Sequence, residues 1–413
     1  MNRIEGALCL WSFVALRLRL ARCAPRLCLC LLPFLLLGCA TPKYNVVLTG
    51  NILVDGPNMI ANGPPKDKVL WEYRTAAAAM RQGRFDVAKP LLDEALLTLG
   101  GVYGKDAEAR KSRRLFSRES RKTFIGEPYE RSMAYFYRGV IYWRDGELDN
   151  ARACFRSAEF EDSDVENKEY AGDWVLPDYL DGLATTKLGG DGSDAYTRAL
   201  AVARNINLPE YQPRANVIFI VEYGPGPLKY GGGRYGEELR FRTRASPVLS
   251  AQIKTGTIDL QVAPCDDLNF QATTRGGRVM DHVLANKAVF KKTTDTLGDA
   301  AIISGSILAA TQQGQHNDGD EIGLGLVLAG LASKLISAAT TPEADIRTWD
   351  NLPQFISFAV MKLPPGEHAV TVEFNNAHGQ ADPKLTKQLT VIVPPDGDKV
   401  VFISDTSTTP QTQ

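Results

Sequence analysis

The histidines, serines and carboxylates of this chain are not arranged in the spacings that are typical of metal sites or catalytic sites. None of the four histidines is paired at the spacing of metal ligands, and no Gly-x-Ser-x-Gly sequence marks a nucleophilic serine. The adjacent carboxylates Asp266 and Asp267 would point to opposite faces of a strand. The sequence therefore predicts no metal site, no cofactor and no catalytic residues. Catalysis is unsupported, and a binding role is expected instead.

One cysteine stands in a more informative context. Cys39 directly follows Gly38, with Leu36 three places upstream, at the end of the apolar run Leu31–Leu37. Arginines precede that run and give it a positively charged start. This order of charge, apolar segment and small residue before a cysteine resembles the lipobox of bacterial lipoprotein signal peptides. The resemblance implies that the Cys39 thiol receives a diacylglyceryl group, that residues 1–38 are removed, and that the new amine is acylated.

An ordinary transmembrane anchor is the alternative interpretation of the same run. A spanning helix needs about 20 apolar residues, whereas the strongly apolar part is shorter here and Pro33 interrupts it. We therefore expect cleavage and lipidation, and residues 1–38 are set apart from the fold. Ala40 occupies the place where an aspartate is usual for inner-membrane retention. By resemblance to sorted lipoproteins, we expect a lipid anchor in the outer membrane, with the protein facing the periplasm.

Removal of the leader changes the charge of the chain. The whole chain has 47 basic and 48 acidic residues, and the leader holds five arginines and one glutamate. The remaining 42 basic and 47 acidic residues give a formal charge of −5, which argues against a nucleic-acid partner. Besides Cys39, only Cys154 and Cys265 would remain, and we expect two thiols rather than a disulfide bond.

Residues 39–65 are expected to form a lipidated tether. Asn, Gly and Pro recur between Asn51 and Pro65, and no long apolar period appears. A flexible segment of this length would have a root-mean-square reach of roughly 30 Å. Alternatively, Tyr44–Leu48 forms a strand that joins a later sheet.

Residues 66–207 carry apolar residues at three- and four-residue spacing, which predicts a helical domain. Tyr135–Ala158 matches the spacing of large, small and turn residues in a tetratricopeptide repeat, with Gly139 at a close helix contact and Gly146 at the turn. A second copy begins at Gly83, and a degenerate third covers Tyr179–Val202. Such repeats stack into a concave surface that receives a peptide or another protein.

Residues 208–405 are expected to form a β-rich, sandwich-like domain, because short strand-like runs alternate with turns. A helical insertion at about 277–341 interrupts it and ends in the apolar run Ile322–Ala339. We favour a buried helix for that run over a membrane-inserting hairpin. Residues 406–413 are expected to be a disordered tail. The predicted fold class is α+β: an N-terminal α-helical repeat domain of tetratricopeptide type followed by the β-rich domain.

Two further motifs resemble hallmarks of one family. Phe124–Arg131 reads Phe-Ile-Gly-Glu-Pro-Tyr-Glu-Arg, and Ala344–Pro353 reads Ala-Asp-Ile-Arg-Thr-Trp-Asp-Asn-Leu-Pro. With the lipobox, they resemble a family of uncharacterised bacterial lipoproteins that contain tetratricopeptide repeats. The resemblance implies the domain plan and the location, and it carries no activity.

The candidate partner-binding residues come from these two motifs: Glu127, Tyr129, Arg131, Asp345, Arg347 and Trp349. We expect both motifs to line the junction of the two domains, or a partner site beside it. Arg131 and Arg347 would bind carboxylates, and Tyr129 and Trp349 would be packing anchors. The alternative is architectural: Pro128 starts a helix, and Trp349 fills the core of the sandwich.

A second candidate surface is basic. Within Lys105–Lys122, four arginines share one face of a predicted helix: Arg110, Arg114, Arg118 and Arg121. That face could meet lipid headgroups or an acidic partner. A solvated face is the alternative.

These observations predict a lipid-anchored envelope protein that acts as a protein-binding scaffold or assembly factor through helical repeats. Its expected partners are an envelope protein or peptide and, through the lipid anchor, the membrane. Two alternatives stay open. One is an envelope enzyme that acts on peptidoglycan or glycan with carboxylates brought together by the fold, and the other is a component of a secretion pore.

Overall fold

The computed structural model describes residues 44–102, 122–163, 171–203, 206, 208–234, 236–274, 343–408 and 411–412. Most of the helices lie in the N-terminal half of the chain and the strands in the C-terminal part, so the predicted α+β class is confirmed. The described residues from Val46 onward form one compact unit. The predictions for the leader with Cys39, for Arg110, Arg114, Arg118 and Arg121, and for the insertion at 277–341 lie outside the described residues.

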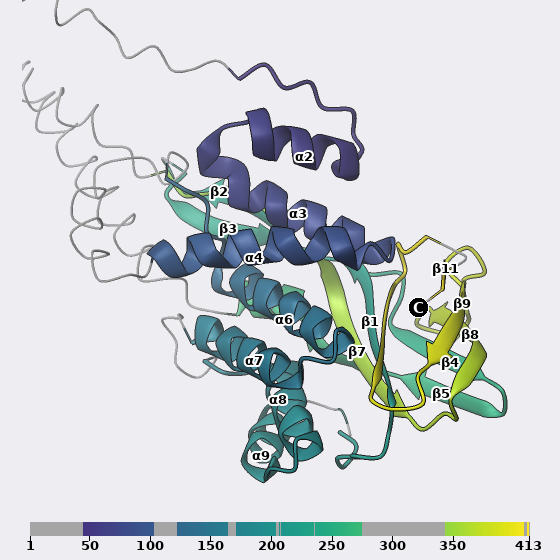
Figure 1. Cartoon of the computed structure of the whole chain (residues 1–413). Coiled ribbons are helices and arrows are strands. Elements are labelled where there is room, and N and C mark those ends of the chain that lie inside the picture. The colour runs from purple at the N-terminus through teal and green to yellow at the C-terminus, as the bar shows by residue number, and fades with distance from the viewer. Residues whose placement is uncertain are drawn as a thin grey trace, which may run out of the picture. The chain divides into compact units, whose positions relative to one another are not determined.

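The N-terminal half is a layer of helices in which each helix contacts the next along the chain (Figure 1). The elements are α2 (Ile52–Asn62), the 3₁₀ turn η1 (Pro65–Asp67), α3 (Lys68–Arg81), α4 (Phe85–Val102), α6 (Pro128–Arg144), α7 (Leu148–Asp162), α8 (Val175–Lys187) and α9 (Ser193–Val202). Among the described residues, no helix has the length and apolar character needed to cross a membrane.

Glycines set the geometry of the helical pairs. Gly83 and Gly146 turn the chain between α3 and α4 and between α6 and α7, with φ of 70° and 81°. These values favour glycine because a Cβ is poorly tolerated there. Gly139 allows α6 to approach α7, since a Cβ at this position would lie 2.6 Å from the ring of Phe155.

The C-terminal part holds two larger sheets and a hairpin. The four-stranded sheet has the order β10 (Lys399–Ser404), β1 (Val217–Pro225), β7 (Pro353–Met361) and β6 (Pro264–Asp267). The five-stranded sheet has the order β11 (Gln411–Thr412), β9 (Lys387–Val393), β8 (Gly366–Asn375), β4 (Ser250–Thr255) and β5 (Ile258–Val262). The hairpin is β2 (Leu228–Gly232) with β3 (Glu238–Arg242), and a short helix, α10 (Leu268–Thr273), follows β6.

The strand pairing departs from a wholly antiparallel sandwich. β1 pairs antiparallel with β7 but parallel with β10, and β11 pairs parallel with β9. The other pairings in the two sheets are antiparallel. The parallel pair places β10, the last strand of the four-stranded sheet along the chain, beside β1, its first strand.

The four-stranded sheet is the middle layer of three. Along β1, Ile218 and Ile220 pack in the core shared with the helices, whereas Phe219 and Val221 pack in the core shared with the five-stranded sheet. The helices therefore cover one face of the middle sheet and the five-stranded sheet covers the other (Figure 1). The expected boundary at residue 208 separates most of the helices from the strands. The helical layer and the middle sheet nevertheless share one hydrophobic core.

Two predictions for the termini of the folded part are wrong. The tether expected at residues 39–65 contains α2, whose N-cap Asn51 accepts a hydrogen bond from the Leu53 N–H at 3.1 Å. The alternative strand at Tyr44–Leu48 is not formed. The tail expected at residues 406–413 includes β11, and Ser407 just before it is buried.

Candidate functional site

The first motif builds the start of α6. Gly126 adopts a positive φ of 83°, and Pro128 stands in the first turn, where a missing N–H costs no helical hydrogen bond. Glu127 and Glu130 form a capping box, in which Glu130 Oε2 accepts a hydrogen bond from the Glu127 N–H at 2.7 Å. The architectural expectation that Pro128 starts a helix is therefore confirmed.

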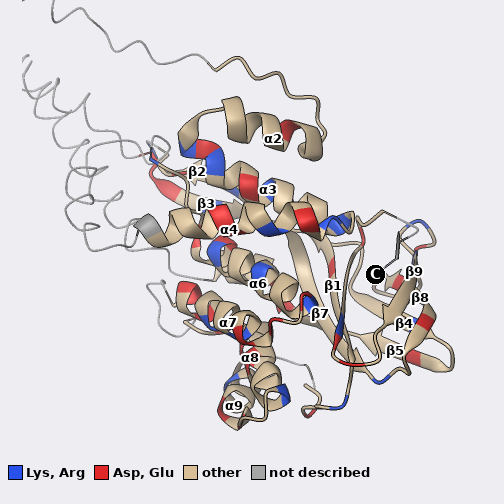
Figure 2. Cartoon of the chain, in the orientation of Figure 1, with Lys and Arg blue, Asp and Glu red and all other residues tan. Residues whose placement is uncertain are grey.

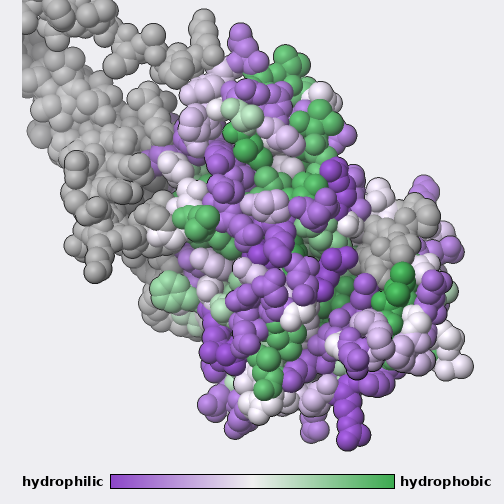
Figure 3. All heavy atoms as spheres, viewed as in Figure 1, coloured by the Kyte–Doolittle hydropathy of each residue, from purple (hydrophilic) through white to green (hydrophobic). Residues whose placement is uncertain are grey.

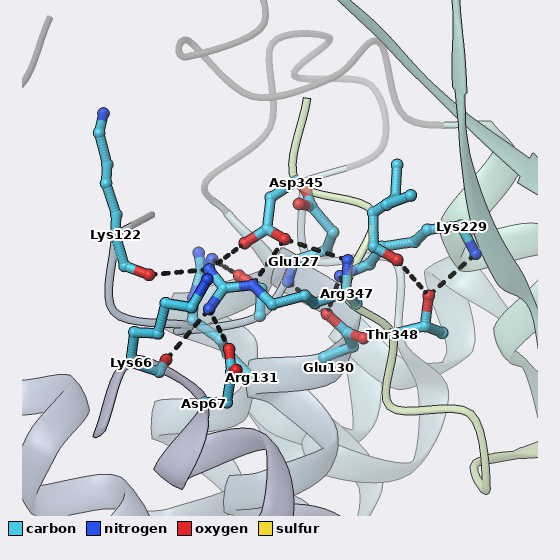
Figure 4. A network of polar contacts seen from close by, with 12 residues as sticks. Lys66, Asp67, Lys122, Glu127, Glu130, Arg131, Lys229, Asp345, Arg347 and Thr348 are labelled. Atoms are coloured by element: carbon cyan, nitrogen blue, oxygen red, sulfur yellow. Dashed lines mark hydrogen bonds and ion pairs between the residues drawn. The ribbon is translucent and has the colours of Figure 1, made fainter. Parts of the chain in front are cut away.

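Glu130 also joins the helices to the hairpin and to the second motif. Its Oε1 accepts a hydrogen bond from the Trp349 N–H at 2.8 Å, and its Oε2 forms an ion pair with Lys229 of β2. The two charged side chains are at most 1% exposed. Lys229 Nζ also donates to the Arg347 carbonyl oxygen at 2.9 Å. One buried carboxylate thus holds three separate segments together (Figure 4).

Arg347 forms the second centre of this network. Its guanidinium makes a forked pair with Asp345, with Nε–Oδ1 2.8 Å and Nη2–Oδ2 2.6 Å. It also donates to Asp67 Oδ1 at 2.7 Å and to the carbonyl oxygens of Lys66 and Lys122 at 3.1 and 2.9 Å (Figure 4). Arg347 therefore fixes the second motif to the turn before α3 and to the residues before α6. We call the contacts of Glu130, Lys229, Asp345, Arg347 and Asp67 the junction network.

The ionised forms of Asp345 and Arg347 stabilise each other. Burial acts to raise the pKa of Asp345, but the hydrogen bonds and positive charge of Arg347 outweigh it and hold that pKa below its usual value. Burial acts to lower the pKa of Arg347, and Asp345 and Asp67 reverse this effect and raise it. The forked pair is therefore charged at neutral pH.

The other two candidate residues of the first motif contact the helical layer and the hairpin. Arg131 is fully buried, pairs with Glu161 of α7 and donates to the Gly126 carbonyl oxygen at 2.9 Å. Tyr129 packs edge-on against Phe241 of β3, with ring centroids 5.9 Å apart. Both expected arginine–carboxylate contacts are present, but the contact of Arg131 lies within the helical layer.

Trp349 lies among the helices. Its ring stacks on Tyr73 of α3, with centroids 4.4 Å and planes 21° apart, and meets Tyr137 of α6 edge-on at 5.8 Å. The expectation that Trp349 fills the core of the sandwich is therefore wrong, since it belongs to the core shared by the helices and the middle sheet. The contacts of Glu130, Arg347 and Trp349 place both motifs at the junction. The assignment of the six candidate residues to a partner site stays a prediction.

A pocket of about 520 Å³ opens beside the junction network. Its walls come from η1 and α3, from β2, and from the second motif. The lining residues are Asp67, Leu70, Trp71, Arg74, Leu228, Lys229, Ile346, Arg347, Thr348 and Asp350. We call it the junction pocket. Four of its side chains are apolar or aromatic, and its charged side chains are of both signs.

Arg74 connects the two sides of the junction pocket. Its Nη2 donates to the Thr348 carbonyl oxygen at 2.8 Å, and its Nε lies 2.9 Å from Asp350 Oδ1. The guanidinium carbon lies 5.1 Å from the centre of the Trp71 ring. Ile346 is 47% exposed at the rim. The walls are therefore joined by charged contacts, and Ile346 offers an exposed apolar side chain at the rim.

The two carboxylates of the junction pocket bear on the enzyme alternative. Asp67 is bound by Arg347 and Asp350 by Arg74. A glycosidase needs one carboxylic acid kept protonated in apolar surroundings, opposite an ionised one. Each carboxylate of this pocket instead has an arginine as its neighbour. The arrangement suits the binding of a ligand better than acid–base catalysis.

Asp266 and Asp267 have structural roles at helix starts. The Asp266 carboxylate accepts the N–H groups of Val175 and Leu176 at 2.8 and 2.9 Å, in the first turn of α8. Burial raises the pKa of Asp266 to about 7, against the effect of these two hydrogen bonds. Asp267 caps α10 by accepting the Asn269 N–H at 2.9 Å. Because neighbouring side chains point to opposite faces of β6, the two carboxylates bind the first turns of two different helices, α8 and α10.

A second buried carboxylate ties the helices to the middle sheet. Glu222 of β1 is 1% exposed, pairs with Arg81 of α3 and accepts the hydroxyl of Tyr137 from α6. Burial, followed by the negative charge of Glu222, raises the pKa of Tyr137 well above its usual value. Buried carboxylates therefore join the helical layer both to the hairpin, through Glu130, and to the middle sheet, through Glu222.

Sequence reasoning missed the partners of the two motifs. Asp67 precedes an apolar-periodic helix, and an acidic residue in that place is a signal for a helix start. Lys229 carries no such signal. It is separated from Glu130 by 99 residues, and a single lysine in a predicted strand does not indicate which residue it will contact.

The cysteines and the acidic groups suggest no metal centre. Cys154 and Cys265 are free thiols, and burial raises the pKa of each to about 12. In the part of the chain that the structure describes, no group of three or more His, Cys, Asp or Glu could hold a metal ion.

The chain matches no family model, no curated protein and no solved structure.

Proposed function

We propose that this protein is a lipid-anchored scaffold of the bacterial outer membrane that faces the periplasm and binds an envelope protein or peptide in the junction pocket. The observation that carries the proposal is the construction of this pocket. Its walls come from segments far apart in the chain, and the buried pair of Glu130 and Lys229 and the contacts of Arg347 fix them. Rigid walls reduce the entropy that binding costs.

The lining of the junction pocket indicates the kind of partner. Trp71 and Arg74 are of the residue types that contribute most to protein interfaces, and Leu70, Leu228 and Ile346 add apolar surface. The charges beside them are already paired within the pocket. We therefore propose that the partner inserts an apolar side chain and places polar backbone groups against the charged rim.

We also propose that the helical pairs are repeats of tetratricopeptide type. The offsets of two, five, nine and twelve from the turn glycine fall on Phe85, Ala88, Leu92 and Ala95 in α4, and on Leu148, Ala151, Phe155 and Ala158 in α7. All of these side chains except Leu148 are buried. The third pair, α8 and α9, has its turn at Gly189, with φ of 83°, and buries Ala195 and Ala199.

The helical layer is not free to bind a partner on every side. One of its faces packs against the middle sheet through residues such as Ile218, Phe358 and Phe402. We therefore place the partner at the junction pocket, at the N-terminal end of α3, rather than along the face of the repeats that the sheet covers.

Photo-crosslinking tests this proposal. A photoreactive amino acid at Ile346, on the rim of the junction pocket, is expected to give one discrete adduct with an envelope protein in native envelopes. The control position is Ile392 of β9, because its exposure of 45% matches the 47% of Ile346 and it does not line the pocket. Adding Trp71→Ala is expected to lower the yield of the Ile346 adduct by more than half.

Two results would contradict the proposal. One is the absence of any adduct at Ile346 in envelopes that contain the protein at its normal level. The other is the same set of adducts from Ile346 and Ile392, which would show contacts that do not depend on the junction pocket.

A further inference from the structure

α2 presents an uncharged surface. Its only charged residue, Asp55, is 4% exposed. The Asp55 carboxylate accepts the Thr49 N–H at 2.7 Å, the Thr49 hydroxyl at 2.8 Å and the Gly50 N–H at 2.8 Å. The charge of α2 is therefore turned toward the segment before the helix, and the rest of the helix carries no charged side chain (Figure 2).

The contact with α3 fixes which side of α2 faces outward. Gly56 is buried against α3, and a Cβ at this position would lie 1.9 Å from Thr75 Oγ1. The two backbones therefore meet so closely that α2 cannot rotate about its axis without a clash. At 3.6 residues per turn, the side away from Gly56 is fixed as well.

The exposed side of α2 carries an apolar stripe of three residues. At about 100° per residue, Val54, Pro57 and Ala61 fall within an arc of about 60°. Leu53 and Ile60 are partly buried and lie nearer to Gly56. Val54 is 54% exposed. The polar residues Asn58 and Asn62 lie along one edge and are hydrogen-bonded to each other at 2.9 Å.

The stripe continues into the segment before the helix. Val47 is 82% exposed and Leu48 is 53% exposed. Together with the exposed Val54, Pro57 and Ala61 they form what we call the α2 surface. Green, hydrophobic residues lie over α2 and the preceding segment in the space-filling view (Figure 3). Apolar residues gathered on one exposed surface without charge mark a contact site.

We propose that the α2 surface lies on the membrane that holds the lipid of Cys39, with Val47, Leu48 and Val54 at the boundary of headgroups and acyl chains. This inference rests on the proposed lipid anchor. Cys39 precedes Val46 by seven residues, which even in fully extended form span only about 25 Å. The anchor would therefore keep the segment before α2, and with it the α2 surface, close to the bilayer.

The composition of the α2 surface agrees with a bilayer as its occupant. A helix that lies in the interface buries its apolar face to about 5–10 Å, a depth that an uncharged face can enter without desolvating a charge. The side of α2 that carries Gly56 is packed against α3. The acyl chains and the α2 surface would then act as two linked contacts with one membrane, which strengthens the attachment without a new partner.

Site-directed spin labelling of the full-length lipoprotein tests this proposal. Nitroxides are placed at Val47→Cys and, separately, at Val54→Cys, with Cys154→Ser and Cys265→Ser in the background. The protein is reconstituted in vesicles of phosphatidylethanolamine and phosphatidylglycerol. The control is Ile392→Cys, whose parent side chain is 45% exposed on β9. We expect labels at Val47 and Val54 to collide mainly with lipid-soluble oxygen, and the label at Ile392 mainly with a water-soluble nickel chelate.

Three outcomes would overturn the proposal. The first is nickel accessibility at Val47 and Val54 equal to that at Ile392. The second is lipid exposure at all three positions, which would show unspecific contact. The third is exclusion of both reagents from Val54, which indicates a protein partner. Mass spectrometry of the same preparation reports acylation of Cys39 separately, so failure of the α2 contact is distinguished from failure of the anchor.

Discussion

Replacement of Glu130 by alanine is expected to lower the free energy of unfolding by about 3–5 kcal/mol. The Lys229 ammonium, whose side chain is 1% exposed, would lose its carboxylate and remain buried as a charge. The N–H groups of Trp349 and Glu127 would lose their acceptor as well. A buried donor left without a partner costs more than the hydrogen bond itself contributes. Urea unfolding followed by circular dichroism measures the change.

Two controls separate the burial of this pair from a general effect of removing a glutamate. Glu238→Ala breaks the pair with Arg240, whose side chains are 49% and 57% exposed, and should cost less than about 1 kcal/mol. The double variant Glu130→Leu with Lys229→Met is expected to be more stable than Glu130→Leu alone, because it removes the uncompensated charge. A loss below about 1 kcal/mol for Glu130→Ala would refute this role of Glu130.

Trp349→Ala is expected to destabilise the protein by a comparable amount, about 3–5 kcal/mol, but for a different reason. The indole is fully buried between Tyr73 and Tyr137, and its removal leaves a cavity at the junction of α3, α6 and the middle sheet. Thermal and urea unfolding measure the loss. The matched variant is Trp71→Ala, because Trp71 lies on α3, the helix against which Trp349 packs, but lines the junction pocket.

These two tryptophan variants separate architecture from binding. We expect Trp71→Ala to reduce the Ile346 adduct with a smaller loss of stability, since its side chain is only partly buried. If Trp349→Ala left the free energy of unfolding unchanged and still abolished the adduct, Trp349 would be a partner contact instead of a packing anchor.

The start of α6 at Pro128, which is the alternative interpretation of the first motif, follows from local signals in the sequence. Pro128 after a capping residue determines a helix start by itself, since the hydrogen bonds involved join neighbours in the chain. The same reasoning could not find Lys229 as the partner of Glu130. Periodicity indicates which face of an element is buried, but not which residue of a distant element will meet it.

α2 shows how tertiary packing overrides local preference. Gly56 and Pro57 both disfavour a helix interior, and with Asn51 they indicated a loop. The helix forms nevertheless, because Asn51 caps it and Gly56 is the residue that permits contact with Thr75 of α3. Only the N-cap could have been recognised in the sequence.

The helical and β-rich parts share a core for a reason that is visible in β1. Its residues Val217–Val221 are all apolar and buried, and such a run is typical of a strand covered on both faces. One cover is the five-stranded sheet, and the other is the helical layer. If Ile218 and Ile220 had been taken as a second buried face of this strand, the sequence would have predicted a core shared by the helices and the sheet.

Lipid anchoring at Cys39 is the claim on which both proposals depend. Metabolic labelling with a palmitate analogue, followed by isolation of the protein, tests it most directly. We predict label on the parent and on the Cys154→Ser and Cys265→Ser variants, and its loss from Cys39→Ser. Equal label on the parent and on Cys39→Ser would contradict the anchor, and with it the outer-membrane location and the contact of the α2 surface with the bilayer.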